Sequence, residues 1–157
     1  MEKYDANALA VFDTVCRALD GENLKYDTNK KDMIVYLSAR GEDLPIDVIF
    51  KVDAGRGVLT VFSPLDTKAK EEKMVEFAVA VNAANFSLVN GSFDYDISDG
   101  KIMFRMAQPY LNGNISEKVV MYLFYCVFST VDEYNDRFLM LDKGMIDLSK
   151  FIELANS

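Results

Sequence analysis

Residues 46–62 read IDVIFKVDAGRGVLTVF, and this stretch contains the clearest strand pattern in the chain. Apolar and polar residues alternate over 46–53, which is the pattern of a strand with one buried face. The glycines of 54–57 predict a turn, and a return strand follows over 58–62. We expect Pro64 to end that strand, because proline has no N–H for a ladder. The stretch therefore predicts a β-hairpin in an antiparallel sheet.

Helices and further strands surround this hairpin. The periodicity predicts helices over 5–21, 70–85, 115–141 and after Asp147, strands over 24–26 and 33–39, and a second hairpin formed by 86–97 and 101–107. The order is one helix, three or four strands, a helix, two long strands and two helices. This order indicates an α+β fold, with an antiparallel sheet of about five to six strands and flanking helices. No repeat or linker interrupts it, so we expect 1–157 to form one domain.

The composition excludes several classes of partner. The net charge is −8, from 17 basic and 25 acidic residues, so neither nucleic acid nor an anionic membrane surface is expected to bind. The apolar run 119–128 has ten residues, whereas a membrane span needs about 20. The first residues, 1–5, show no export signal. We therefore expect a cytoplasmic protein with no membrane partner.

The chemistry-bearing residues do not indicate an enzyme. The chain has no histidine, which removes the commonest general base and the commonest metal ligand. Two cysteines cannot form a Cys₄ zinc site, and we expect Cys16 and Cys126 to be unpaired and buried because each lies in an apolar helical pattern. No phosphate-binding loop occurs. We expect no catalytic residue, no metal ion and no cofactor.

The second hairpin carries an acidic stretch, from Asp94 through Asp96 to Asp99. A calcium loop would require glycine at its sixth position and glutamate at its twelfth, but counting from Asp94 these positions hold Asp99 and Arg105. Asp94 and Asp96 share one strand face, and Arg105 lies on the returning strand. We therefore expect Asp94, Asp96 and Arg105 to form a surface ion pair across the hairpin.

The predicted helix over 115–141 is apolar on more than one side. One face, with Val119, Leu123, Val127 and Tyr134, is expected to pack on the sheet. Met121, Tyr125 and Phe128 lie on the opposite side, and we expect them to form a protein interface, most simply that of a homodimer. The alternative is that the last helix, with Phe151, Ile152 and Leu154, folds over these residues.

One part of the chain, residues 82–134, resembles the YbjN family of bacterial sensory transduction regulators, whose fold is similar to that of type III secretion chaperones. The matching features are Asn82 and Asn85 ending a helix, Gly91-Ser92-Phe93-Asp94 opening a strand, Asp99-Gly100-Lys101-Ile102 in a turn, Arg105 on the return strand, and Asp132 with Tyr134 in a late helix. The resemblance implies a curved antiparallel sheet with flanking helices, in a non-enzymatic domain that binds proteins. It also implies structural glycines at 91 and 100, and a surface pair of Asp94 with Arg105. The chain departs from the family in lacking tryptophan and in having an additional last helix.

These observations lead to two functional hypotheses. The first is a non-catalytic protein-binding module, chaperone-like or regulatory in bacterial signal transduction, whose client the sequence does not identify. A client segment would bind as an added strand or as an amphipathic helix. The alternative is a sensor domain for a small molecule or an ion, based on the acidic hairpin and the aromatic residues. A saturable rise in melting temperature with a metabolite or cation would favour the sensor.

Overall fold

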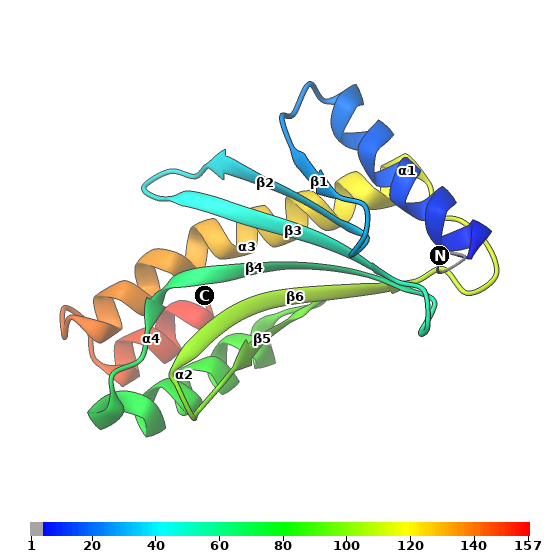
Figure 1. Cartoon of the computed structure of the whole chain (residues 1–157). Coiled ribbons are helices and arrows are strands. Elements are labelled where there is room, and N and C mark those ends of the chain that lie inside the picture. Colours follow the sequence, from blue (N-terminus) through cyan, green and yellow to red (C-terminus); the bar gives the residue numbers. More distant parts are fainter. Residues whose placement is uncertain (1–4) are drawn as a thin grey trace.

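The computed structural model describes residues 5–157 (Figure 1). Residues 1–4, most of the segment searched for an export signal, lie outside the described residues. The elements, in order, are α1 (Ala6–Gly21), β1 (Asp27–Asn29), β2 (Ile34–Arg40), β3 (Pro45–Asp53), β4 (Val58–Lys68), the 3₁₀ turn η1 (Glu71–Lys73), α2 (Met74–Ser87), β5 (Ser92–Tyr95), β6 (Lys101–Pro109), α3 (Glu117–Asp142) and α4 (Leu148–Ala155). The predicted α+β class and order of elements are confirmed. No helix within residues 5–157 combines the length and apolar character that a membrane span needs.

The strands form a six-stranded antiparallel sheet in the order β1-β2-β3-β4-β6-β5. Alternate residues of the long strands are buried, as in β4, where Leu59, Val61 and Leu65 face the core. The helices that the structure describes lie on this buried side, with α1 and α3 behind the sheet and α2 and α4 near its β5 edge (Figure 1). The opposite face of the sheet carries no helix in the described chain, and we call it the open face.

Pro64 does not end its strand, contrary to the expectation from the sequence. The β3–β4 ladder stops at the pair Ile49–Phe62, whereas β4 continues beside β6 and still pairs Pro64 with Met103. Two residues later, Asp66 donates its N–H to the side chain of Asn135 in α3, 3.4 Å away, instead of to β6. The β4–β6 pairing is irregular between Pro64 and Lys68, and beyond Phe62 the β3 side of β4 has no strand partner in the described chain, so the missing N–H of Pro64 interrupts no regular ladder. The β4–β6 ladder therefore tolerates the proline.

Other boundaries also differ from those predicted. The first short strand is 27–29 instead of 24–26, and α2 extends to Ser87, so that β5 is much shorter than the predicted strand over 86–97. α3 begins at Glu117 because Ser116 caps it by accepting a hydrogen bond from the Val119 N–H. Cys16 and Cys126 are free as expected but only half-buried, so the predicted full burial is wrong. Burial still raises the pKa of the Cys16 thiol.

A cluster of aromatic rings joins the helices to the β5 side of the sheet. Phe138 of α3 lies at its centre, with ring centroids 5.8 Å from Phe77 of α2, 5.6 Å from Phe93 of β5 and 4.9 Å from Phe151 of α4. The Tyr134 ring is 4.9 Å from Phe93. Rings at these separations attract each other beyond the effect of their burial. Two pairs of consecutive elements, α2 with β5 and α3 with α4, therefore share one core.

Asn85 of α2 closes part of the outer edge of β5. Its side-chain amide donates to the Phe93 carbonyl at 3.0 Å, and its side-chain oxygen accepts from the Phe93 N–H at 2.6 Å. The two backbone groups of Phe93 that point away from β6 are therefore already satisfied. A side chain that occupies the edge in this way hinders pairing with another strand.

We expect Asn85→Ala to lower the free energy of unfolding by about 2 kcal/mol, because it leaves a half-buried backbone donor and acceptor without partners. Urea denaturation followed by circular dichroism measures this loss. Asn112→Ala, in an exposed loop, is the matched control and is expected to change stability by less than about 0.5 kcal/mol. Equal effects of the two substitutions would contradict the role given to Asn85.

Candidate functional site

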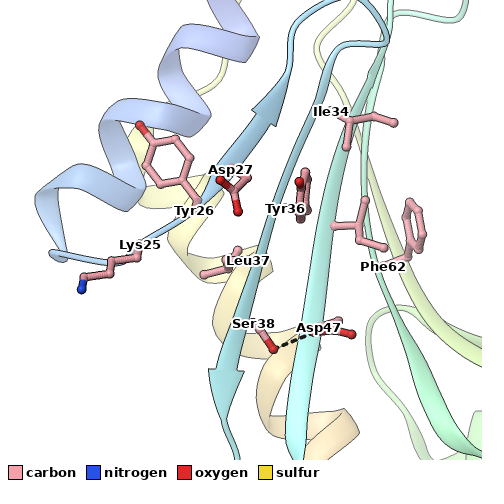
Figure 2. A pocket seen from close by; sticks show the side chains of 10 residues that line it. Lys25, Tyr26, Asp27, Ile34, Tyr36, Leu37, Ser38, Asp47 and Phe62 are labelled. Carbon is pink, nitrogen blue, oxygen red and sulfur yellow. Dashed lines mark hydrogen bonds between the residues drawn. The ribbon is translucent and has the colours of Figure 1, made fainter.

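A hollow lies on the open face, across β2, β3 and β4, and we call it the sheet groove. Its volume is about 780 Å³. The residues that line it are Lys25, Tyr26, Asp27, Ile34, Tyr36, Leu37, Ser38, Asp47, Ile49 and Phe62. Figure 2 shows them from the segment beside α1 to Phe62 on β4.

The floor of the groove is formed by apolar side chains on the open face of the sheet. Ile34 and Tyr36 of β2, Ile49 of β3 and Phe62 of β4 alternate with residues that point into the core. Tyr36 is 46% exposed, which is high for a large aromatic side chain. At one end, Ser38 donates a 2.7 Å hydrogen bond to Asp47 (Figure 2). The groove thus combines an apolar floor with a polar rim, as binding surfaces commonly do.

One wall of the groove is an incomplete sheet edge. β1 pairs with β2 only from Ile34 to Tyr36, so within residues 5–157 no strand pairs with the outer edge of β2 from Leu37 to Arg40. The segment before β1 carries Tyr26 close to α1 (Figure 2). The Tyr26 hydroxyl donates to Asp20 of α1 at 3.0 Å. Burial, followed by this hydrogen bond, raises the pKa of Tyr26 well above its usual value, so the hydroxyl remains a donor at neutral pH. The gap leaves strand-pairing groups accessible beside the apolar floor.

The acidic residues of the second hairpin are occupied by local partners. Arg105 donates to both carboxylate oxygens of Asp94, at 2.6 and 3.2 Å, and lies diagonally across the β5–β6 ladder from it. The hydrogen bond to Asp94 raises the pKa of Arg105. Asp96 is not part of this pair, because its carboxylate accepts from the backbone N–H and hydroxyl of Ser98 in the turn. Asp99 binds Lys101 at 2.9 Å.

The carboxylate oxygens of the second hairpin are engaged in local contacts. Each of the three carboxylates has a partner in its own hairpin, and in the described part of the chain no group of three or more acidic, histidine or cysteine residues is placed to hold a metal. Gly100 has a φ of +79°, and the carbonyl of Ala69 occupies the place of a Cβ, so a side chain is excluded there. The conformation of the hairpin turn therefore requires glycine at position 100.

The predicted interface on α3 is only partly exposed. Tyr125 is 51% exposed and its hydroxyl lies 3.5 Å from Glu22 beside α1, whereas Met121 and Phe128 are half-buried. Phe128 shares a small hollow with Leu154 of α4, so the last helix reaches one end of this face. On the other side of α3, Leu123, Val127 and Tyr134 are buried, as expected, while Val119 is half-buried. Tyr122, one turn before Tyr125, is also 51% exposed, so part of this side of α3 remains open to solvent.

A second group of carboxylates connects the β2–β3 loop to α3. Asp132 accepts a 2.8 Å hydrogen bond from the Glu42 N–H. Asp136 is close to Asp43, and the hydrogen bond between their carboxyl groups is the main cause that raises the pKa of Asp136, followed by burial and by the charges of Asp43, Asp132 and Glu42. Folding therefore shifts Asp136 toward its protonated form relative to the unfolded chain.

This raised pKa predicts a pH-dependent effect of Asp136→Asn. A carboxyl group whose pKa is higher in the folded than in the unfolded state stabilises the fold when protonated, and that contribution is lost as pH rises through the folded pKa. We therefore expect Asp136→Asn to raise the melting temperature at pH 7 and to have a smaller effect toward pH 4. Thermal denaturation from pH 4 to 8 measures it, with Asp13→Asn on exposed α1 as control. A constant difference across this range would contradict the raised pKa.

The groove residues were not singled out by the sequence. The predicted strands include Ile34, Tyr36, Ile49 and Phe62, and each of these interrupts an otherwise polar face. An apolar residue at a position where the alternation predicts a polar one is the sequence feature that indicates an apolar surface on the outer face of the strand. The missing information was which sheet face the helices cover.

Comparison with solved structures assigns the fold to the type III secretion chaperone class. The HopA1–SchA chaperone–effector complex contains a chain that matches with a TM-score of 0.60 and 10% identity, over 84% of this chain and 98% of the other. The ExsC–ExsE complex matches with a TM-score of 0.55 and 11% identity, over 84% and 95%. At these identities the similarity concerns the fold alone.

The family is established by sequence. Residues 12–140 match the model of YbjN, described as "Putative bacterial sensory transduction regulator", so the chain belongs to the YbjN family. The crystal structure of YbjN from E. coli, described as a putative transcription regulator, has a TM-score of 0.60 and 10% identity, over 85% of this chain and 92% of the other. No curated protein matches the chain. The resemblance noted in residues 82–134 is confirmed and extends over most of the chain.

Proposed function

We propose that residues 1–157 act as one non-catalytic protein-binding module, chaperone-like or regulatory in bacterial signal transduction, and that the sheet groove binds an extended segment of a client protein. The observation that carries the proposal is the apolar floor of the groove beside the unpaired edge of β2. A segment lying along Leu37–Arg40 would add a strand to the sheet, and its alternate side chains would face the floor.

The chemistry of the groove supports binding over catalysis. Its ionisable residues are Lys25, Tyr26, Asp27, Tyr36 and Asp47, and among these Tyr26 stays protonated while Asp47 accepts from Ser38. Ser38 and Asp47 are a hydroxyl–carboxylate pair among the lining residues, but both are exposed and the chain has no histidine to act as the base. The fold neighbours include chaperones in complex with effectors, which is consistent with a polypeptide ligand.

A small-molecule sensor is the second candidate, because the volume of the groove lies within the range of about 300–1,000 Å³ that small-molecule pockets occupy. A metabolite that raises the melting temperature of the wild type but not of Tyr36→Glu would favour this candidate. We also propose a cytoplasmic location and a homodimer. The YbjN description and the chaperone complexes fit a cytoplasmic regulator, whereas the homodimer requires a measurement of mass.

We expect Tyr36→Glu and Phe62→Glu to reduce client capture at least about tenfold, because a buried, unpaired carboxylate opposes docking of an apolar segment. Tagged wild-type and variant proteins are used to capture clients from the native host, and the co-purified proteins are quantified by mass spectrometry. Met145→Glu, at a 69% exposed position after α3, is the matched control. Capture of the same proteins in the same amounts by wild type and groove variants would contradict the proposal.

A further inference from the structure

The side of α3 that faces away from the sheet carries no charged residue over about three and a half turns. None of residues 119–131 is Asp, Glu, Lys or Arg. Two tyrosines on this side, Tyr122 and Tyr125, are each 51% exposed. The solvent-facing side of a surface helix is ordinarily charged or polar, so this composition indicates an interaction surface. We call it the α3 outer face, formed by Met121, Tyr122, Tyr125, Phe128 and Ser129.

Three residues of the α3 outer face form one line along the helix. Met121, Tyr125 and Phe128 follow each other at spacings of four and three residues, which places them on the same side of neighbouring turns. A hollow of about 230 Å³ lies at the Met121 end, beside Gly21 where α1 ends, and another of about 460 Å³ lies at the Phe128 end. We call them the first and second end hollows. The line is therefore recessed at both ends, which is a shape that a partner helix can occupy.

Existing contacts hold the two tyrosine side chains. The Asn90 side-chain amide donates to the Tyr122 hydroxyl at 2.6 Å, and the Tyr125 hydroxyl donates to Glu22 at 3.5 Å. The Tyr125 ring also lies 5.3 Å from the Phe124 ring, centroid to centroid. A side chain held in place before binding loses little conformational freedom on binding, so it opposes association less than a mobile one. Tyrosine is also among the residue types that contribute most to protein interfaces.

The charge at the second end hollow is negative. Its four carboxylate residues are Glu42, Asp132, Glu133 and Asp136. The basic residue that lines it is Arg137, whose guanidinium already pairs with Glu133 at 2.6 Å. The first end hollow is more evenly balanced, by Glu22, Glu117 and Lys118. Basic groups on a partner would complement the second end hollow more than the first, so the charges define an orientation.

We propose that the α3 outer face binds an amphipathic helix of another protein, with its apolar side against Met121, Tyr125 and Phe128 and its lysine or arginine residues beside Asp132. The inference goes beyond the proposed function, because α3 covers the buried side of the sheet and the sheet groove lies on the open face (Figure 1). The surface from Met121 to Asp132 is about 17 Å long, which matches about three turns of a partner helix. Apolar residues at helical spacing in the partner would lie along this line.

The composition of the chain favours a basic partner over a second copy at this surface. With a net charge of −8, a second copy would bring further negative charge, whereas a basic helix would neutralise the charge already present. None of the α-helices of the described chain contains more than two basic residues, so a second copy has no basic helix to place beside Asp132. A client segment in the sheet groove would leave the α3 outer face free, since the two surfaces lie on opposite sides of the sheet.

Binding of a synthetic probe peptide tests the surface. The probe is a fluorescein-labelled, alanine-rich helix of about 18 residues, with leucine along one side and lysines in its last turns. Fluorescence anisotropy with wild-type protein should give a dissociation constant in the micromolar range, and Tyr125→Glu should weaken binding at least about tenfold. Ile97→Glu, at a 58% exposed apolar position in a hairpin turn, is the matched control and should not change the affinity. Absence of binding to wild type, or equal binding by wild type and Tyr125→Glu, would overturn the proposal.

A change in the charge of the probe tests the preference for a basic partner. A second probe with glutamate in place of each lysine should bind wild type at least about tenfold more weakly. Glu42→Lys should weaken binding of the basic probe about threefold, because it reverses a charge at the second end hollow. The hydrogen bond from the Glu42 N–H to Asp132 does not involve the Glu42 side chain, so this variant keeps the loop in place and decides the question even where Tyr125→Glu alters folding. Equal affinity of the two probes would overturn the assignment of a basic partner.

Photo-cross-linking in the native host identifies the partner. With p-benzoylphenylalanine in place of Tyr125, mass spectrometry should locate the cross-link in another protein, in a segment with apolar residues at helical spacing and basic residues at one end. Cross-links only to a second copy of this chain would overturn the proposal and place the homodimer on α3. The proposed function is tested separately, because Tyr36→Glu should lose client capture but still bind the probe. Loss of probe binding by Tyr36→Glu and not by Tyr125→Glu would place the probe in the sheet groove and overturn the α3 surface.

Discussion

The rest of the structure depends on one constraint: the helices of the described chain cover only one of the two faces of the sheet. The strands alternate so that one face is almost wholly apolar, and the helices of the described chain pack against that face around the rings of Phe138 and its neighbours. The open face must then tolerate water, although it keeps Tyr36 and Phe62. This asymmetry creates a shallow apolar floor on a rigid sheet, where an extended segment can be bound without rearrangement of the core.

The two edges of the sheet differ in how well they are protected, and this difference determines where a further strand can pair with the sheet. Asn85 occupies the backbone groups of Phe93 on β5, and Asn135 accepts from Asp66 where β4 leaves β3. Nothing comparable covers β2 after Tyr36 in residues 5–157, because β1 has only three residues. Edge strands are usually protected against pairing, so an unprotected edge beside an apolar floor indicates use.

The sequence predicted the elements better than it predicted the surfaces. Alternation over 46–53 and the glycines of 54–57 identified the central hairpin. Helical spacing identified the four α-helices of the described chain to within a few residues. Pro64 was misjudged because a missing N–H matters only on a paired side, and pairing depends on tertiary structure. Periodicity gives the phase of a strand or helix but not what covers it. For this reason the helical spacing predicts an interface at Met121 and Phe128 without showing that α4 and α1 lie nearby, and the strand pattern does not single out Tyr36.

The central claim is that a client pairs with the edge of β2, and amide hydrogen exchange of the complex tests it most directly. The account predicts that the outward-facing amides in Leu37–Arg40 exchange at least about tenfold more slowly when client is bound, because they become hydrogen-bonded. Unchanged exchange at Leu37–Arg40, with protection confined to the helices, would contradict it.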